Sequence, residues 1–572
     1  MQVDLNDRPS EWGKLGARSA FLFLATAAYT LSSLALLAPI RHHAYFVLLI
    51  AQYIVLLPVF LYTLSLGREG DGNIGVPRFS LRLVVTIFLV LAAIVSWQVT
   101  QGIVVPDESA YRFQGAVFAS GHLWADAPPG AGSRISEVPP PLYFEHILLE
   151  GRKWYSQYPP LWPAVLAPTL KVHGEWLLSP LFGALLLIIT AATSELVFGG
   201  DGATGPLAAS MMALSPYYLT NSVGIMTHAF CGVIIGGAIW LCFKGLRLQR
   251  LRHLTWMFGL LSIACLTRYF TGAVMSVVLG LVALWCVRRN RTLLVRTALV
   301  GALFAALILG AILTYNYIYT GGYLVSPYSL VKDTRLPFYA APQLVFDARE
   351  IWYTILHDKR WGVQRTLFYA MPFLYVLAGY AVLREPKYRT EVRILALLSV
   401  CLVVAYQFET EDSAAINGER YYFEVFGAVA MMAARGLALL LHKFGTRVRD
   451  AWVAIGCLMV MQTCPYGVAI HTLVSRTIEQ RQIRVLASRL TDTTRAAFLS
   501  ETLPFAPKHF QLNGTDWRSA KLMFMVDPGP GGRQEWACRM GRSQWVIFGY
   551  DAATNSITQQ FGSVPSGRCP QR

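Results

Sequence analysis

The sequence predicts a mainly α-helical protein that crosses a membrane many times. Of its 572 residues, 55% are hydrophobic and only 14% are charged, whereas a soluble globular protein carries about 25% charged residues. Several apolar runs reach the length of about 20 residues that a membrane-spanning helix needs. Short clusters of Lys and Arg separate these runs, as in the cytoplasmic loops of membrane proteins. We therefore attribute the net charge of +16 to topology and expect membrane lipids, not nucleic acid, as surroundings.

Length and flanking charge together predict about thirteen spans. The first apolar run is long and lacks a small-residue cleavage site, so we expect it to remain as an anchor. The predicted spans are 18–39, 44–66, 81–101, 177–198, 205–221, 227–243, 254–268, 270–287, 297–317, 368–383, 393–408, 421–441 and 451–473.

The distribution of basic residues predicts the orientation. Four basic clusters fall between spans on the same side as the N-terminus, and by the positive-inside rule this side is the cytoplasm. We expect a multi-pass protein of the cell (inner) membrane, with the C-terminal residues outside the cytosol. The clusters are Lys244/Arg247/Arg250/Arg252, Arg288/Arg289/Arg291/Arg296, Arg384/Lys387/Arg389/Arg393 and Lys443/Arg447/Arg449.

Three regions follow from this topology. Residues 1–80 form a two-helix accessory segment, 81–473 a transmembrane module, and 474–572 a small extracytoplasmic domain. The module contains two long outer loops, 102–176 and 318–367, which are rich in Trp, Tyr and Pro. Because these loops also contain amphipathic pieces such as Pro141–Trp154, we expect interfacial helices within them.

The C-terminal region has a different pattern. Residues 478–499 suggest a helix, while Lys521–Val526 and Gln544–Tyr550 alternate like buried strands around a turn-rich stretch. We therefore expect a small α/β domain. Seven of the nine cysteines lie in or beside apolar runs without metal-ligand spacing. Cys538 and Cys569 lie in this region, and outside the cytosol they can form a disulfide.

An acidic pair, Asp107-Glu108, follows the third predicted span. One interpretation is a helix N-terminus, in which Pro106 opens the helix, the acids suit the dipole and Glu108 pairs with Arg112. The other is chemistry, because a carboxylate at the membrane surface can take a proton from an acceptor hydroxyl. The neighbouring carboxylate can then orient the acceptor or share a divalent cation such as Mg²⁺, Mn²⁺ or Ca²⁺.

Polar and aromatic positions on the same expected side are further candidates. Residues 153–163 contain Tyr158 before two prolines, which indicates an interfacial aromatic belt and equally a platform for sugar stacking. His228 begins a span, where a lone His is ordinarily structural. Arg268 lies between two apolar runs, and a charge within the membrane indicates function. Its planar guanidinium suits a lipid phosphate.

Two more stretches complete the set. Residues 418–424 enter a span from the same side and contain Arg420 and Tyr421, which also fits an ordinary snorkelling Arg among interfacial tyrosines. Residues 315–328 contain Tyr328 after Ser326-Pro327, which also fits a turn leaving a helix. The sequence has no G-x-x-x-x-G-K-[ST], H-E-x-x-H or G-x-S-x-G motif, so ATP-driven transport, zinc proteolysis and serine hydrolysis are not indicated.

In their order along the chain, these stretches resemble the GT-C glycosyltransferases. The similar branch depends on polyprenyl phosphate and includes protein O-mannosyltransferases and the lipid A aminoarabinose transferase. The resemblance runs from about residue 81 to the end of the chain. The matching residues are Asp107, Glu108 and Tyr111, Tyr158-Pro159-Pro160, Ser215-Pro216, Thr227-His228, Thr267-Arg268, Tyr315-Asn316, Thr320-Gly321, Ser326-Pro327-Tyr328 and Glu419-Arg420-Tyr421-Tyr422.

The resemblance implies a GT-C-like fold and an inverting sugar transfer. The donor is a polyprenyl-phosphate sugar, and the acceptor is an envelope glycan, lipid or protein. Asp107 is the base, with Glu108 beside it as the second catalytic carboxylate, and both are the candidate metal ligands. Cationic groups such as Arg268 or Arg420 stabilise the departing phosphate. The predicted substrate-binding residues are Tyr111, Arg112, Tyr158, His228, Arg268, Tyr328, Arg420 and Tyr421.

The chain departs from the family pattern in two places. Two spans precede the family's first helix, and Gln157-Tyr158 stand where the aminoarabinose branch has a Lys, which weakens any transfer of lipid A specificity to this chain. Two other classes of function stay open. A transporter often shows inverted repeats, and none is visible in the sequence. A non-catalytic scaffold for envelope assembly leaves Asp107-Glu108 without a role.

Overall fold

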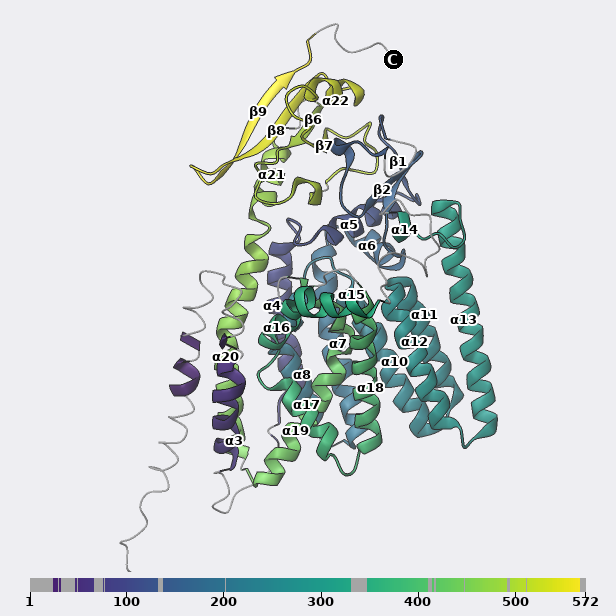
Figure 1. Ribbon diagram of the computed structural model, residues 1–572, viewed down its shortest axis with the longest axis vertical. Coiled ribbons are helices and arrows are strands. Elements are labelled where there is room, and N and C mark those ends of the chain that lie inside the picture. Colours follow the sequence, from purple (N-terminus) through teal and green to yellow (C-terminus); the bar gives the residue numbers. More distant parts are fainter. Residues whose placement is uncertain are drawn as a thin grey trace, which may run out of the picture.

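The computed structural model describes most of the chain and places the helices side by side, with a small sheet at one end (Figure 1). The described residues are 24–28, 30–31, 47–48, 50–65, 76, 78–131, 137–200, 202–330, 347–409, 414–415, 418–446, 448–490, 494–510 and 512–565. The chain is mainly helical, as predicted.

The long helices make up the body of the molecule, and shorter ones lie at its ends and turns. The long ones are α4 (Leu81–Val99), α7 (Leu178–Phe198), α10 (His228–Leu248), α11 (Leu251–Thr267), α12 (Tyr269–Val287), α13 (Arg291–Thr320), α18 (Arg389–Ala405), α19 (Phe426–Phe444) and α20 (Val448–Ser475). The shorter ones are α3 (Leu57–Ser65), α5 (Pro106–Ala119), α6 (Leu161–Lys171), α8 (Thr204–Ala213), α9 (Pro216–Asn221), α14 (Pro327–Leu330), α15 (Ala348–Tyr353), α16 (Arg360–Tyr369), α17 (Leu374–Arg384), α21 (Ile478–Ser488) and α22 (Arg533–Arg539).

The helices make this a multi-pass membrane protein. Within the described ranges, eight helices are long and apolar enough to cross a membrane, or nine if the bent pair α16–α17 counts as one span. The prediction of thirteen spans is not confirmed by this count. Most of the predicted span 18–39 lies outside the described residues, whereas most of the span 44–66 lies within them.

One predicted span, 205–221, is divided into two short helices. Helix α8 ends at Ala213 and α9 begins at Pro216, with Ser215 between them in an extended conformation (φ −92°, ψ 114°). A residue before proline is disfavoured in the helical region, because the proline ring crowds its backbone. Pro216 therefore interrupts the helix that the apolar pattern predicted.

Helix α19 lies in the centre of the body, and small residues allow its neighbours to come close. A Cβ atom on Gly436 would lie 1.9 Å from the carbonyl oxygen of Leu377, so only glycine permits this contact between α19 and α17. Arg435, next to it, donates to Glu385 at 2.6 Å and so ties α19 to the end of α17. This packing holds α19 against α17, and the segment directly before α19, Arg420–Val425, carries part of the site.

Residues 102–176 combine two helices with a small sheet. The strands β1 (Ala125–Asp126), β2 (Ile147–Glu150) and β3 (Lys153–Ser156) form an antiparallel sheet in the order β1-β3-β2. The prediction of an interfacial helix over Pro141–Trp154 is therefore wrong. Gly151, at φ +59°, closes a hairpin between β2 and β3, and a left-handed glycine favours this turn over a helix.

The C-terminal sheet, residues 494–565, has the strand order β7-β6-β8-β9. Its strands are β6 (Arg495–Leu499), β7 (Leu522–Val526), β8 (Gln544–Asp551) and β9 (Ser556–Ser563). Strand β6 is parallel to β7 and β8, and β9 is antiparallel to β8. Strands β7 and β8 coincide with the two predicted strands. The predicted helix 478–499 ends at Ser488, because residues 495–499 form the fully buried strand β6.

Cysteines follow the predicted division. The seven in or beside the apolar runs are free. Cys538, on α22, is disulfide-bonded, and Cys569 lies outside the described residues.

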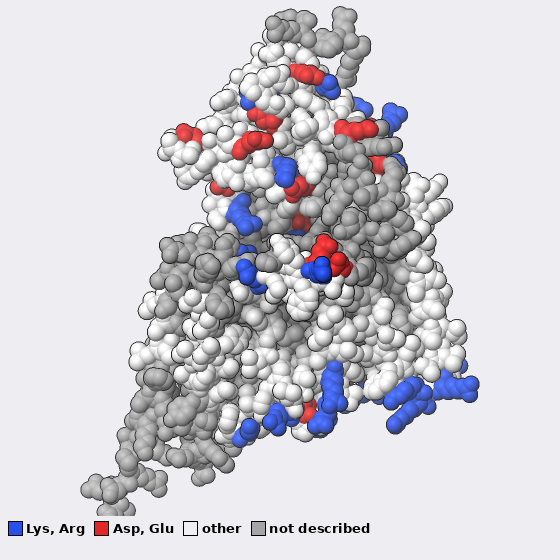
Figure 2. Space-filling model, in the orientation of Figure 1, with Lys and Arg blue, Asp and Glu red and all other residues white. Residues whose placement is uncertain are grey.

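Basic side chains gather at the end of the molecule opposite the C-terminal sheet (Figure 2). The connections α10–α11, α12–α13, α17–α18 and α19–α20 all lie there, because each pair of helices is antiparallel and meets at this end. The described residues of the four basic clusters thus share one side of the helix bundle, as the sequence predicts.

Candidate functional site

Asp107 lies at the start of α5, where the chain leaves α4 and turns across the end of the bundle. Val105 is extended and Pro106 occupies the first helical turn, so the helix begins with Asp107 and Glu108 beside its positive end. The Asp107 side chain is buried, with the residue only 7% exposed. Tyr158 donates to its Oδ1 at 2.6 Å, and Arg420 Nη2 lies 3.3 Å from the same oxygen.

The surroundings of Asp107 keep it ionised. Burial alone raises the pKa of this carboxyl, but the Arg420 guanidinium, the His146 ring and the Tyr158 hydroxyl together lower it to about 2. An anionic Asp107 is therefore available as a proton acceptor at neutral pH. While Arg420 and Tyr158 hold it, its basicity is low.

Glu108 faces the turn between α9 and α10. Its carboxylate accepts from the backbone N–H of Val104 at 2.8 Å and of Ile225 at 3.0 Å. Gly224, at φ +75°, leaves room for it, since a Cβ there would lie 2.4 Å from Glu108 Oε1. Burial raises the pKa of the Glu108 carboxyl, against these backbone hydrogen bonds, which lower it. Glu108 thus anchors the start of α5.

The helix-terminus interpretation predicted that Arg112 pairs with Glu108, and the structure shows that it does not. The oxygens of Glu108 are occupied by backbone donors, and Arg112 instead donates to Glu175 at 2.6 Å and to the carbonyl of Thr100 at 3.1 Å. Its guanidinium thus ties α5 to the outer ends of α4 and α7. It stands apart from the other predicted substrate-binding residues.

A second charged group surrounds Arg268, at the break between α11 and α12. Its Nε lies 3.4 Å from Glu424 Oε1, and Nη1 lies 3.2 Å from the ring of His228. His228 in turn lies 3.2 Å from the same Glu424 oxygen. Tyr406 accepts from Arg268 Nη2 at 3.3 Å. The His228 and Glu424 side chains have no exposed surface.

Tyr421 joins the two groups. The guanidinium carbon of Arg268 lies 5.1 Å from the centroid of the Tyr421 ring, and that of Arg420 lies 5.5 Å from it. The structure thus brings Asp107, Arg420 and Arg268 into one place, although they lie far apart in sequence. Arg420 also has a buried Nε with no hydrogen-bond partner within the described part of the chain.

Tyrosines in ring-to-ring contact form another wall of the site. The Tyr111 and Tyr158 rings lie 4.5 Å apart between centroids, and the Tyr328 ring packs edge-on against Tyr158 at 5.6 Å. Tyr315 donates to the carbonyl of Tyr158 at 3.0 Å. Tyrosines from three stretches that are far apart in the sequence, 106–112, 153–163 and 315–328, therefore meet beside Asp107.

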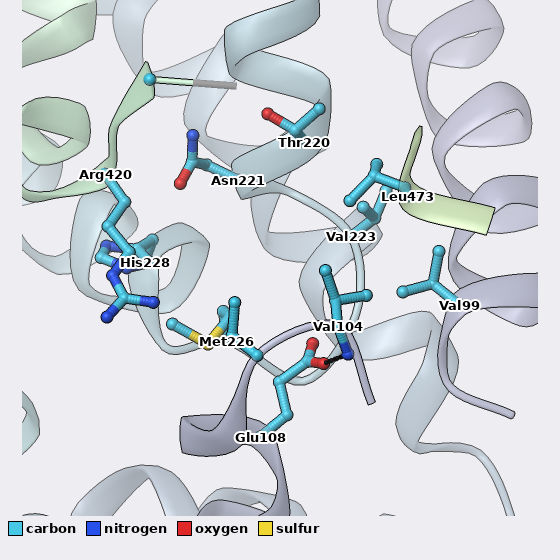
Figure 3. A pocket seen from close by; sticks show the side chains of 12 residues that line it. Val99, Val104, Glu108, Thr220, Asn221, Val223, Met226, His228, Arg420 and Leu473 are labelled. Carbon is cyan, nitrogen blue, oxygen red and sulfur yellow. Dashed lines mark hydrogen bonds between the residues drawn. The ribbon is translucent and has the colours of Figure 1, made fainter. Parts of the chain in front are cut away.

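A small cavity of about 40 Å³ reaches this site between α4, α9 and α10. Glu108, His228 and Arg420 are its charged or titratable lining residues, and the rest of the wall is mainly apolar (Figure 3). In the same view the hydrogen bond from Val104 to Glu108 closes one side. A cavity of this size holds about one or two water molecules.

A divalent cation at Asp107 and Glu108 does not fit this arrangement. Hard cations need several oxygen ligands. Here Arg420 and Tyr158 engage Asp107, and two backbone N–H groups engage Glu108. Among the described residues, no group of three or more His, Cys, Asp or Glu side chains is placed to hold a metal.

Sequence reasoning missed three members of the site. Glu424 lies within the stretch 418–424 but was not named as a site residue. The signal for it was an acid one turn beyond Arg420 in an apolar run, which indicates a buried charge. Tyr406 ends an apolar helix and gives no separate signal. His146 contacts the Tyr158 ring at 5.5 Å and has φ +65°, and nothing in the sequence around it predicts either feature.

Comparison with known proteins identifies the fold. No protein-family model matches the sequence, and no curated protein matches it. Among solved structures, ArnT from Cupriavidus metallidurans bound to undecaprenyl phosphate is similar, with a TM-score of 0.51 and 14% identity over 81% of this chain and 93% of that chain. The apo state of ArnT gives a TM-score of 0.45 and 13% identity over 81% and 92% of the two chains.

Arabinosyltransferase EmbB from Mycobacterium smegmatis gives a TM-score of 0.39 and 13% identity over 79% of this chain and 45% of that chain. The likeness to ArnT in the bound state extends over about four-fifths of this chain and most of that one. At this identity it establishes the fold, which is the GT-C-like arrangement that the ordered motifs predicted.

Proposed function

We propose that this protein is a membrane glycosyltransferase that uses a polyprenyl-phosphate sugar and an envelope acceptor. The observation that carries the proposal is the Asp107–Arg420 ion pair, with both Arg420 and Arg268 in contact with the Tyr421 ring. One carboxylate and two guanidinium groups at a membrane surface provide a base and a phosphate site. The undecaprenyl phosphate bound to ArnT, which has the same fold, supports a donor of this kind.

The chemistry follows from these groups. The donor phosphate lies against Arg420 and Arg268, and the unpartnered Nε of Arg420 supplies a hydrogen-bond donor to it. As Arg420 turns toward the phosphate, Asp107 loses its cation and becomes a stronger base. The acceptor hydroxyl gives its proton to Asp107 and attacks C1 of the sugar. The C1–O bond to phosphate breaks, the phosphate leaves with the electron pair, and the anomeric centre inverts.

The same proposal assigns the regions of the chain. Residues 1–80 are an accessory segment, 81–473 the catalytic module, and 474–572 a small outer domain. The end that carries the basic clusters is cytoplasmic, in accordance with the positive-inside rule. Asp107, the outer loops and the C-terminal sheet then lie on the extracytoplasmic side of the inner membrane.

Replacement of Asp107 tests the proposal. Loss of a general base costs about 10²–10⁴-fold in rate, so D107N should lose at least a hundredfold in sugar transfer from a polyprenyl-phosphate donor. The control is D126N, which alters an exposed acid on β1 paired with Arg518 and should transfer sugar at the wild-type rate.

The same assay separates the other two classes of function. Full activity of D107N would contradict the mechanism. A wild-type protein that moves the lipid across a vesicle membrane without cleaving the sugar–phosphate bond would be a transporter. One that does neither would be a scaffold.

A further inference from the structure

A second and larger cavity lies between the helical body and the C-terminal sheet. Its volume is about 480 Å³, within the range of about 300–1,000 Å³ typical of small-ligand sites. Three segments line it: Ile103–Val105 before α5, the junction of α20 and α21, and residues 504–509 from the C-terminal sheet. No residue of the proposed catalytic group lines this cavity.

The walls of this cavity are firmly held. Gln480 Nε2 donates to the carbonyl of Ile103 at 3.1 Å. Thr477 packs against Gly102 so closely that a Cβ on the glycine would lie 2.6 Å from the Thr477 Cβ. On the opposite side, Glu145 pairs with both Lys508 and His509 at 2.7 Å. The loop 504–509 is thus tied to residues 102–176, and the cavity is a built feature.

The cavity adjoins the catalytic site. Val104 and Val105 line both this cavity and the small one that contains Glu108 and Arg420. Pro106 and Asp107 follow directly along the chain. A ligand in the larger cavity therefore has only this short wall between it and the proposed base.

The lining suits a carbohydrate. Gln480 is 2% exposed, and its side-chain oxygen has no hydrogen-bond partner in the described ranges, so it can accept from a ligand hydroxyl. Arg476 and Glu479 add a donor and an acceptor of opposite charge, and Phe505 adds an aromatic face. Such a mixture serves the adjacent hydroxyls and the apolar ring face of a sugar.

We propose that this cavity receives the acceptor, and that the acceptor is the terminal sugar of a glycan. The inference rests on the proposed function and narrows its acceptor from glycan, lipid or protein to a carbohydrate. It also gives the C-terminal sheet a role, because residues 504–509 form the wall that recognises the acceptor. Once the segment Val104–Val105 moves aside, the acceptor hydroxyl comes within hydrogen-bond reach of Asp107, loses its proton to it and forms the new bond to C1, as described above.

The test uses the full-length protein in lipid nanodiscs. The probes are p-nitrophenyl glycosides of gluco, manno, galacto and arabino configuration, with a Ser/Thr peptide as the non-carbohydrate acceptor. Binding is measured by saturation-transfer NMR without donor, and transfer is measured with a polyprenyl-phosphate sugar. A506W fills the cavity and E479Q removes its negative charge, whereas E501Q changes an exposed acid outside the lining.

We expect at least one glycoside to bind and to accept sugar. A506W and E479Q should raise its KM tenfold or more while the affinity for polyprenyl phosphate stays within twofold, which shows that the fold is intact. E501Q should behave as wild type. Unchanged KM values in both cavity variants would overturn the inference, as would transfer to the peptide with no glycoside accepted.

The experiment distinguishes failure of the acceptor-site inference from failure of the proposed glycosyltransferase function. Glycoside binding that A506W abolishes, in a wild-type protein that never cleaves the donor, would leave the carbohydrate site standing and reject the glycosyltransferase. Donor cleavage with no binding of any glycoside would do the reverse.

Discussion

Asp107 and Arg420 form an ion pair, and this pairing determines how Asp107, the proposed base, responds to pH. The folded-state pKa of Asp107, about 2, is below its ordinary value of 3.8. The pair therefore contributes stability above about pH 4, and this contribution is lost as the pH falls through about 2. Asp107 stays anionic between pH 4 and 8, so its protonation imposes no acid limb on activity in that range.

Removal of Arg420 should change this behaviour. In R420Q, burial is no longer opposed by the adjacent cation, and an opposite charge at this range lowers a carboxyl pKa by about 1–3 units. We expect the residual kcat/KM of R420Q to show an acid limb displaced upward by about that amount. The control R268Q should lose activity with no displacement, because Arg268 is bonded to Glu424 and His228. An unchanged pH profile in R420Q would show that Asp107 is not the base.

The same contacts predict the response to metal removal. Donor groups already occupy the Asp107 and Glu108 carboxylates. We expect transfer activity to be unchanged after dialysis against EDTA, and unchanged again when Mg²⁺, Mn²⁺ or Ca²⁺ is added back. Loss with EDTA and recovery with one of these ions would show that the donor complex rearranges these carboxylates into a metal site.

At the scale of elements, the position of Arg420 depends on how strand β5 (Gly418–Glu419) packs on α16. Gly418 has φ +125°, and a Cβ there would lie 2.5 Å from Thr366 Oγ1 and 2.9 Å from Thr366 Cα. Glu419 N–H donates to the same Thr366 oxygen at 2.7 Å. Only glycine therefore lets the chain pass α16 and place Arg420 beside Asp107.

We expect G418A to disturb the site without unfolding the protein. A residue forced into a sparsely populated conformation costs about 1–3 kcal/mol, which should appear as a lower unfolding temperature in detergent. A displacement of about 1 Å can cost a hundredfold in rate, so we expect transfer to fall about tenfold to a hundredfold. G456A, on α20 in open space, is the matched control. Equal activity of both variants would show that Arg420 is placed independently of this contact.

Elements with one dominant local signal could be predicted from the sequence, and those set by packing could not. The apolar lengths of α4, α7 and α10 predicted spans, and the alternation in 544–550 predicted β8. The hairpin β2–β3 was missed because Gly151 decides it, against an amphipathic pattern. The site was predicted as a set of motifs, yet the Arg420–Asp107 pair and the bond from Arg112 to Glu175 depend on tertiary contacts that no local pattern encodes.

At the scale of the whole molecule, charge is distributed along the bundle axis. The α10–α11 and α12–α13 connections lie at the end away from the C-terminal sheet (Figure 1), and they carry the exposed residues Arg250, Arg252, Arg288, Arg289 and Arg291. Helices α10 to α13 alternate in direction, so His228, Arg268 and Tyr319 all come to the opposite end. The polar site and the basic loops thus lie at opposite ends of the helix bundle, which suits the proposed enzyme, whose donor and acceptor would both be outside the cytosol.

This arrangement predicts from which side of the membrane each segment can be labelled. Basic loops are retained in the cytoplasm, so a cysteine introduced at Arg289 should resist a membrane-impermeant maleimide in spheroplasts with an intact inner membrane and react only after permeabilisation. A cysteine at Glu501, in the C-terminal sheet, should react without permeabilisation. The wild-type protein, whose cysteines in the helices are free, provides the background. Labelling of Arg289→Cys in intact spheroplasts would invert the topology and place Asp107 on the cytoplasmic face, where the proposed acceptor cavity would meet a different set of glycans.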